Sequence, residues 1–316
     1  MVSLTSARLS RRAEQGPAAR RRTSAAGAGR PGAGWAVPGL VFFGVFALLP
    51  MAGVVYLSLT AWDGVTAPRF IGWHNWSRFL GDHQMVQSTL VTGVLLLGNI
   101  LVQAPISILL GVWSAGRQRN RAVLSAVFFL PLLLSTAATA VMWRQLLDPN
   151  FGLPSKMSWL FLGDQNMLGT QAGSIVCLIA VTSWQFIPFH TLLYQGAARN
   201  VPVTLYQAAA IDGAGRARAF FSITLPQLRN TIVTSTTFMV VGGLTAFDVV
   251  LLLTNGGPGT DTATLPFQMY QTAFVTFDYG YASAVATFLL LLATGASLLL
   301  VRLTGYHKMT STLEGL

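Results

Sequence analysis

The residues best suited to specific chemistry lie in one polar stretch, residues 202–226 (PVTLYQAAAIDGAGRARAFFSITLP), between long apolar segments. Pro202 suits the first turn of a helix, where its missing N–H is not needed, and Gly213 suits the left-handed residue that ends one. Between them, residues 208–210 are three alanines that another protein surface can approach closely. The ionisable and amide side chains of the stretch are Gln207, Asp212, Arg216 and Arg218. We therefore predict a docking element here.

Familiar catalytic and cofactor motifs are absent from the sequence. It contains no GxxxxGK[ST] phosphate loop, no GxSxG elbow and no HExxH pair. The four histidines lack metal-ligand spacing, and the single cysteine, Cys177, lies inside an apolar run. We expect no enzyme activity, no metal and no cofactor bound by this chain.

The composition is that of an integral membrane protein. Hydrophobic residues make up 53% of the 316 residues and charged residues 9%, whereas about a quarter of a soluble domain is charged. We predict six transmembrane helices in an all-α fold, each long enough for a hydrocarbon core of about 30 Å. Prolines 105, 131 and 188 should kink these helices without ending them. The predicted spans are 37–59, 88–113, 122–143, 172–193, 232–253 and 282–302.

The distribution of positive charge predicts the topology. With the N-terminus inside, 16 of the 20 Lys and Arg residues lie on the cytoplasmic side and 4 on the other, a clear positive-inside bias. Both termini and residues 202–226 are then cytoplasmic. We expect a disordered basic cytoplasmic tail (1–34), a membrane domain (35–305) and a short cytoplasmic tail (306–316). The first tail lacks the interleaved aromatic residues that favour nucleic-acid binding, so no such partner is expected.

The spacing within residues 202–226 resembles the EAA loop of the permease subunits of binding-protein-dependent ABC importers. Gly213 follows a Gln-Ala-Ala triplet after three residues, and nine residues separate it from an Ile-x-Leu-Pro group. The form of the loop, with the segments AFDVVLLLTNGGPGTDT (246–262) and VMWRQLLDPNFG (141–152), resembles the carbohydrate branch of that family. The residues matching the loop are Tyr206, Gln207, Ala208, Ala209, Asp212, Gly213, Ala214, Ile223, Leu225 and Pro226.

This resemblance implies a type I ABC importer permease fold, with the loop (200–226) acting as a coupling helix on an ATPase. It implies three protein partners: a second homologous permease subunit, an ABC ATPase dimer that carries ATP and Mg, and an extracytoplasmic sugar-binding protein. The lipid bilayer is the fourth expected partner. One position departs from the pattern, because Gln207 stands where the family usually has Glu. Glutamine keeps the hydrogen-bonding reach of Glu but not its charge, so a bond to an ATPase arginine would be weaker.

The resemblance places the substrate path on the helices that flank the loop. Thr182, Phe186 and Phe189 share one helical face, with Gln185 beside it, while Gly243 and Ala246 leave room on the next span. Packing between helices explains these residues equally well.

Asp248 is the only acid within a predicted span. At 1.5 Å per residue it lies about 24 Å along its helix, near the outer surface. It is either a hydrated interfacial residue or part of the translocation path.

The favoured function is import of a carbohydrate, a di- or oligosaccharide, by ATP-driven alternating access. One alternative keeps this architecture and changes the cargo to a non-sugar solute. A second is a standalone secondary transporter, which normally needs an intramembrane ion site. A membrane-embedded enzyme would need clustered catalytic residues that the sequence lacks.

Overall fold

The computed structural model describes residues 33–116, 121–157, 159 and 166–303, and most of them are helical. The tail predicted at 306–316, and residues 1–32 of the tail predicted at 1–34, lie outside the described residues. In chain order the elements are η1 (Ala33–Ala36), α1 (Val37–Phe43), η2 (Gly44–Leu48), α2 (Leu49–Leu57), β1 (Thr60–Ala61), β2 (Arg69–Phe70), α3 (His74–Gly81), α4 (His83–Ala115), α5 (Arg121–Leu133), α6 (Thr136–Leu146), α7 (Leu153–Lys156), η4 (Met167–Gly169), α8 (Gln171–Arg199), α9 (Val203–Ile211), α10 (Arg216–Ala219), η5 (Phe220–Thr224), α11 (Leu225–Gln227), α12 (Arg229–Leu244), η6 (Val250–Thr254), α13 (Leu265–Tyr270), η7 (Gln271–Val275) and α14 (Tyr279–Leu303).

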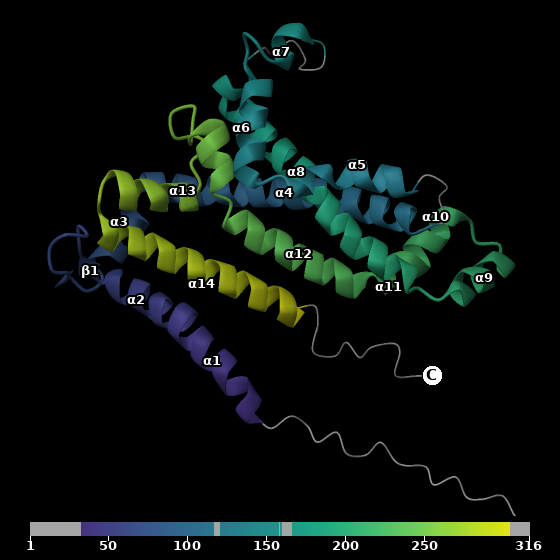
Figure 1. The fold of residues 1–316 in the computed structure, drawn as a ribbon, viewed down its shortest axis with the longest axis horizontal. Coiled ribbons are helices and arrows are strands. Elements are labelled where there is room, and N and C mark those ends of the chain that lie inside the picture. Colours follow the sequence, from purple (N-terminus) through teal and green to yellow (C-terminus); the bar gives the residue numbers. More distant parts are fainter. Residues whose placement is uncertain (1–32, 117–120, 158, 160–165, 304–316) are drawn as a thin grey trace, which may run out of the picture. The chain divides into compact units, whose positions relative to one another are not determined.

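The described residues form two units, which divide between Met51 and Ala52. In the second unit, α4 packs along α8 and α12, and α14 packs on α12 and α13 (Figure 1). Gly111 of α4 permits the close approach of α8, because a Cβ there would collide with Tyr194 and the backbone of Thr191. The core lies where α4, α8, α6 and η6 meet, and its buried residues include Val91, Leu95, Ala140, Leu178, Val181, Val250 and Leu253.

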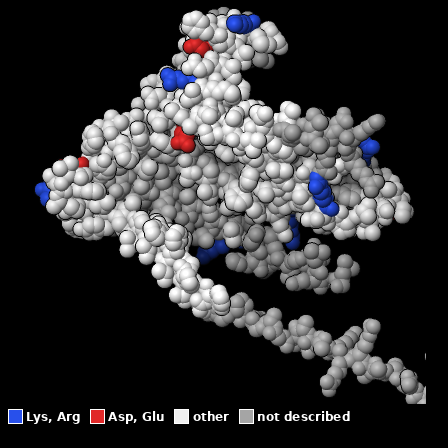
Figure 2. Space-filling model, viewed as in Figure 1, with Lys and Arg blue, Asp and Glu red and all other residues white. Residues whose placement is uncertain are grey.

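Four of the six predicted spans are helical runs of membrane length. They are Gly34–Leu57, His83–Ala115, Gln171–Arg199 and Tyr279–Arg302, which correspond to the first, second, fourth and sixth predicted spans. Figure 2 shows few charged side chains on one face of the molecule, as expected for helices that contact lipid. Multiple membrane-crossing helices are therefore confirmed.

The third predicted span is not a single kinked helix. The segments Val127–Leu133 and Thr136–Leu146 meet at an angle of 110°. Pro131 lies in the last turn before the bend, where its ring opposes continuation of the helix. Ser135 then starts α6 as an N-cap, with an extended backbone and a side chain that accepts a hydrogen bond from the Ala138 N–H at 3.2 Å. Because Ser135 starts a new helix soon after Pro131, the third predicted span consists of two helices and not one kinked helix.

The fifth predicted span is also broken, so the expectation of one unbroken helix over 232–253 is wrong. Helix α12 ends at Leu244, residues 245–247 are not helical, and helical structure resumes at Asp248. The second segment ends at Asn255, whose left-handed backbone (φ 51°) stops the helix. Two adjacent glycines at 242 and 243 weaken the helix just before the break. Figure 1 shows the change of direction after α12.

The only β-structure among the described residues is a short antiparallel pair, β1 and β2, in which Thr60 lies opposite Phe70. Asn75 of α3 holds this pair by donating hydrogen bonds to the carbonyls of Ser58 and Thr60. Figure 1 places β1 and α3 at the opposite end of the helical bundle from α9. The all-α fold class is therefore confirmed for the membrane domain, apart from this small hairpin.

Candidate functional site

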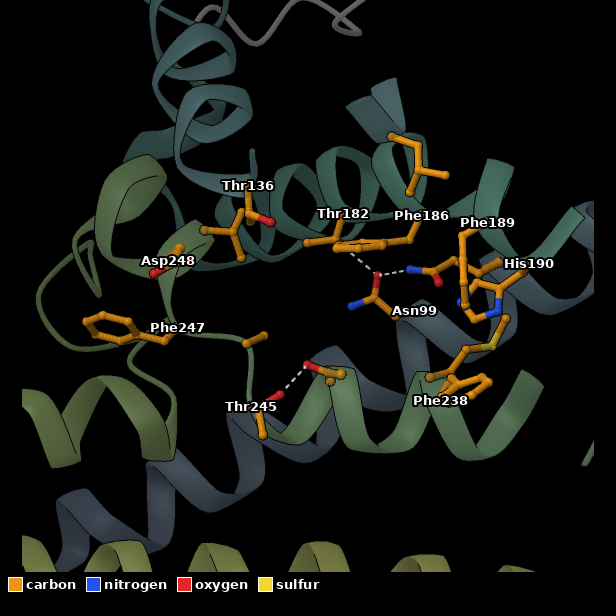
Figure 3. A pocket seen from close by; sticks show the side chains of 17 residues that line it. Asn99, Thr136, Thr182, Phe186, Phe189, His190, Phe238, Thr245, Phe247 and Asp248 are labelled. Atoms are coloured by element: carbon orange, nitrogen blue, oxygen red, sulfur yellow. Dashed lines mark hydrogen bonds between the residues drawn. The ribbon is translucent and has the colours of Figure 1, made fainter. Parts of the chain in front are cut away.

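A cavity of about 400 Å³ lies at the break in the fifth predicted span. It is bounded by α4, α8, α12 and the segment that follows α12 (Figure 3). Its lining combines aromatic, amide and hydroxyl side chains, listed here in full: Asn99, Gln103, Leu132, Thr136, Thr182, Phe186, Phe189, His190, Phe238, Met239, Gly242, Gly243, Thr245, Ala246, Phe247, Asp248 and Val249.

The backbone of Ala246, at the break, makes long hydrogen bonds beside this cavity. The Ala246 N–H reaches the Gly243 carbonyl only at 3.5 Å, and the Ala246 carbonyl accepts from the Thr264 hydroxyl at 3.4 Å. Irregular backbone at membrane depth is stable where it is buried in protein or lines a hydrated cavity, since lipid offers it no hydrogen-bond partners. Discontinuous helices of this kind form binding sites in membrane transporters.

A polar network anchored on Asn99 crosses from α4 to α8. The Asn99 Oδ1 accepts a hydrogen bond from Gln103 Nε2 at 3.0 Å and lies 2.6 Å from the Thr182 Oγ1 (Figure 3). His190, which also lines the cavity, has its Nδ1 2.9 Å from the Ser235 hydroxyl and so joins α8 to α12. These side chains give the cavity both hydrogen-bond donors and acceptors.

Four phenylalanine rings also line the cavity: Phe186, Phe189, Phe238 and Phe247. Phe189 meets Phe238 at a centroid distance of 5.8 Å, and Phe186 lies one turn along α8 from His190. Figure 3 shows these rings around the same space as Asn99. Apolar rings with a few oriented polar groups are the usual composition of a small-molecule site.

Among the described residues that line the cavity, Asp248 alone carries a full charge. Its side chain is exposed and has no hydrogen-bond or ion-pair partner among the described residues. An unpaired carboxylate within a membrane-spanning region is costly and normally has a functional reason. Asp248 lies on the cavity wall, just after the helix break.

Six of the seven residues predicted for the substrate path line this cavity: Thr182, Phe186, Phe189, Gly243, Ala246 and Asp248. The seventh, Gln185, does not. Its Nε2 donates to the Leu134 carbonyl at 3.0 Å, at the bend between α5 and α6. Gln185 therefore supports the broken third span.

The sequence did not predict that residues of α4 and of the broken span line the cavity. Asn99 and Gln103 are one turn apart inside an apolar span, and this spacing of polar residues was the available signal. Thr136, Thr245 and Phe247 gave no such signal, because they reach the cavity only through breaks that the hydropathy pattern does not show.

A second candidate element, α9, lies at the end of the bundle opposite β1 (Figure 1). Pro202 is its N-cap, and Gly213 follows its C-terminus with φ +72°. The Gly213 N–H bonds to the Ala210 carbonyl at 3.1 Å, and the Ala214 N–H bonds to the Ala209 carbonyl at 2.8 Å. This pair of bonds is a Schellman motif, so the predicted left-handed helix end at Gly213 is confirmed.

The surface of α9 is largely open. No residue of α9 is buried, Ile211 is 87% exposed, and Gln207 and Ala208 are exposed. The Tyr206 hydroxyl lies 2.9 Å from the hydroxyl of Thr224, which is buried in the π-helical turn η5. Of the other residues of the loop, Asp212 and Pro226 are exposed, whereas Ala209, Ala214, Ile223 and Leu225 are half-buried.

Membrane-length helices around a cavity at a broken span are features found in membrane transporters. Residues 107–304 match the family described as "Binding-protein-dependent transport system inner membrane component". The chain belongs to this family.

Similar proteins cover most of the chain. It is 32% identical to the multiple sugar-binding transport system permease protein MsmF of Streptococcus mutans, over 82% of this chain and 90% of that protein. It is 31% identical to the trehalose/maltose transport system permease protein MalF of Thermococcus litoralis, over 79% and 85%.

A crystal structure of a bacterial alginate ABC transporter, in complex with its alginate-pentasaccharide-bound periplasmic protein, matches the fold with a TM-score of 0.76. That match has 21% sequence identity and covers 88% of this chain and 95% of the other. It confirms the fold of an ABC importer permease.

Proposed function

We propose that this chain is a permease subunit of an ABC importer and that it translocates a di- or oligosaccharide through the cavity at the broken fifth span. The observation that carries the proposal is the cavity itself. It is lined by aromatic rings, amides and hydroxyls, as a sugar with apolar faces and hydroxyl edges requires. MsmF, MalF and the alginate transporter all handle carbohydrates, which supports the same substrate class.

The charge of the cavity favours a neutral sugar. Asp248 accepts hydrogen bonds from hydroxyl groups, whereas a second carboxylate on the substrate would be repelled in a site of reduced dielectric constant. This chain supplies one wall of the path, and a second homologous permease subunit supplies the other.

Helix α9 couples transport to ATP in this proposal. It seats in a groove of an ABC ATPase dimer, which binds ATP and Mg, and this chain binds neither. The exposed apolar and alanine surface of α9 supports a docking role, and its Schellman end fixes the angle at which it leaves the membrane domain. Tyr206 transmits movement of α9 to η5 and so to α12. The residues that couple α9 to the ATPase are those of the loop predicted from the sequence, residues 200–226.

Orientation follows from the positive-inside count. The termini and α9 are cytoplasmic, and β1, β2 and α3 face the extracytoplasmic side, where a sugar-binding protein delivers its load. Residues 1–34 and 306–316 form cytoplasmic tails, and residues 35–305 form the membrane domain.

The test is uptake by proteoliposomes that contain this chain, the second permease subunit and the ATPase, with the binding protein added. Wild-type vesicles should accumulate radiolabelled maltose or trehalose only with ATP. Gly213→Pro should abolish uptake, because proline cannot adopt φ +72° and lacks the N–H that bonds to Ala210.

Gly213→Asn is the matched control, because asparagine tolerates the left-handed conformation and should retain most of the uptake. Normal uptake by Gly213→Pro would overturn the coupling assignment. ATP-dependent accumulation of neither sugar would overturn the carbohydrate assignment.

A further inference from the structure

A second pocket lies at the end of the bundle that carries β1. It has a volume of about 470 Å³ and lies between the hairpin that contains β1 and β2 and the turn before α14. We call it the loop pocket; its side chains include Trp62, Asp63, Thr66, Arg69, Phe277 and Asp278. An aromatic ring beside carboxylate and guanidinium groups offers a sugar both a stacking face and hydrogen-bond partners.

The hydrogen bonds within this pocket fix its polar groups. The Asp63 carboxylate accepts from the backbone and hydroxyl of Thr66 and from the backbone of Val65. The bonds from Thr66 lower the pKa of Asp63 to about 2, so it is ionised at physiological pH. Trp62 Nε1 donates to the Thr66 carbonyl at 2.8 Å, which fixes the ring at the edge of the pocket.

Phe277 also lines the loop pocket, in an unfavourable backbone conformation. Its φ is +56° and its side chain is 58% exposed. A bulky residue rarely adopts a left-handed conformation, and such strain is characteristic of binding sites. The neighbouring Asp278 holds the turn in place through its N–H bond to the Thr272 carbonyl and its 2.7 Å ion pair with Arg78.

A continuous series of aromatic rings joins the loop pocket to the central cavity. Trp62 meets Tyr279 at a centroid distance of 5.5 Å, and Tyr279 meets Phe274 at 6.1 Å. Phe274 meets Tyr270 at 5.4 Å, and Tyr270 meets Phe247 at 5.1 Å. Trp62 lines the loop pocket and Phe247 lines the cavity, so the series has one end in each.

None of these five rings is buried, although they lie in contact. Phe274 is 57% exposed, and the other four rings are half-buried. Neighbouring rings are inclined to each other by 36° to 82°, so none is stacked face to face on the next. Because each ring is partly exposed, the apolar face of a sugar can contact one ring after another.

From this juxtaposition we infer that the five rings form an aromatic track along which a carbohydrate passes from the loop pocket to the central cavity. The inference rests on the proposed function for its substrate class and direction. The loop pocket receives the sugar at the extracytoplasmic end, and Phe247 hands it to the polar groups around Asn99 and Asp248. The track extends the cavity toward the loop pocket and is separate from α9.

The test replaces one ring of the track in the complete transporter in proteoliposomes, with radiolabelled maltose and trehalose as probes. Phe274→Leu keeps an apolar side chain but removes the ring face, and should lower sugar uptake by about tenfold. Phe274→Tyr restores the ring and should keep uptake within about twofold of wild type. Hydrolysis of ATP stimulated by the binding protein should be unchanged in both variants. Phe274 lies in η7, which adjoins α13, and Figure 1 shows α13 far from α9.

Phe151→Leu is the control, since Phe151 is 84% exposed and is not part of the track; it should leave uptake unchanged. Normal uptake by Phe274→Leu would overturn the track while leaving the proposed function intact. An equal loss in the Leu and Tyr variants, or loss of stimulated ATP hydrolysis, would also overturn it by showing a packing role. Failure of the wild-type transporter to accumulate either sugar would instead count against the proposed function.

Discussion

At the residue scale, hydrogen bonds between polar side chains join the helices that line the cavity. Asn99 is the clearest case, because its Oδ1 accepts from Gln103 within α4 and faces Thr182 of α8. Gln103 is only 5% exposed, so its amide has little access to water. The network holds the α4–α8 wall in one arrangement, as buried polar networks do when their members are paired.

We predict that Asn99→Ala destabilises the protein by about 1–3 kcal/mol, because it leaves the buried Gln103 amide without its acceptor. The midpoint of thermal unfolding in detergent should fall by several degrees. Leu101→Ala is the control, since Leu101 is 73% exposed on the same helix and its truncation should cost much less. Equal stability of the two variants would contradict the structural role of Asn99.

At the element scale, breaks in the helices create the site. The bend after Pro131 brings Thr136 to the cavity, and the break after Leu244 brings Thr245 and Phe247 there. The π-helical turn η5 similarly interrupts the connection between α9 and α12. Such turns are frequent at functional sites, because they place one residue where a regular helix would not.

We predict that Tyr206→Phe lowers the amount of sugar transported per ATP hydrolysed. The change removes the phenol hydroxyl that pairs with Thr224 and so loosens α9 from η5. In a double-mutant cycle with Thr224→Val, the two changes should be coupled by about 1 kcal/mol, the usual net worth of one hydrogen bond. Transport and ATP hydrolysis in proteoliposomes supply the measurements.

Val203→Ala is the control for this cycle, because Val203 is 65% exposed on the same helix. It should leave the ratio of transport to hydrolysis unchanged. Additive effects of Tyr206→Phe and Thr224→Val would show that the hydrogen bond does not carry the coupling.

At the scale of the whole molecule, α9 and the β1–β2 hairpin lie at opposite ends of one bundle (Figure 1). The hairpin borders the loop pocket, and α4, α8 and α12, which run between the two ends, line the cavity. In a rigid-body mechanism, force applied at α9 alters access at the far end because the helices between are packed. This arrangement requires α9 and the β1–β2 hairpin to lie on opposite sides of the membrane.

We predict opposite accessibility for cysteines placed at Val65 and Ile211, which are 91% and 87% exposed, in a Cys177→Ala background. A membrane-impermeant maleimide applied to intact cells should label Val65→Cys at once, and Ile211→Cys only after permeabilisation. Bound ATPase should protect Ile211→Cys and leave Val65→Cys reactive. Labelling of Ile211→Cys in intact cells would overturn the topology, and an unprotected Ile211→Cys would contradict docking at α9.

The sequence by itself determined the membrane class, the positions of the helical segments and the boundaries of α9, because hydropathy, charge and helix-end residues act locally. Gly213 is the sharpest example, since its left-handed conformation follows from its place after an alanine helix. Tertiary structure decided the rest. The breaks at residues 134–135 and 245–247 bring Thr136, Thr245 and Phe247 to the cavity, and the Leu134 carbonyl at the first break holds Gln185 away from it. Hydropathy does not reveal such breaks, because broken and unbroken segments are equally apolar. The backbone groups freed at a break are satisfied only by packing against neighbouring helices.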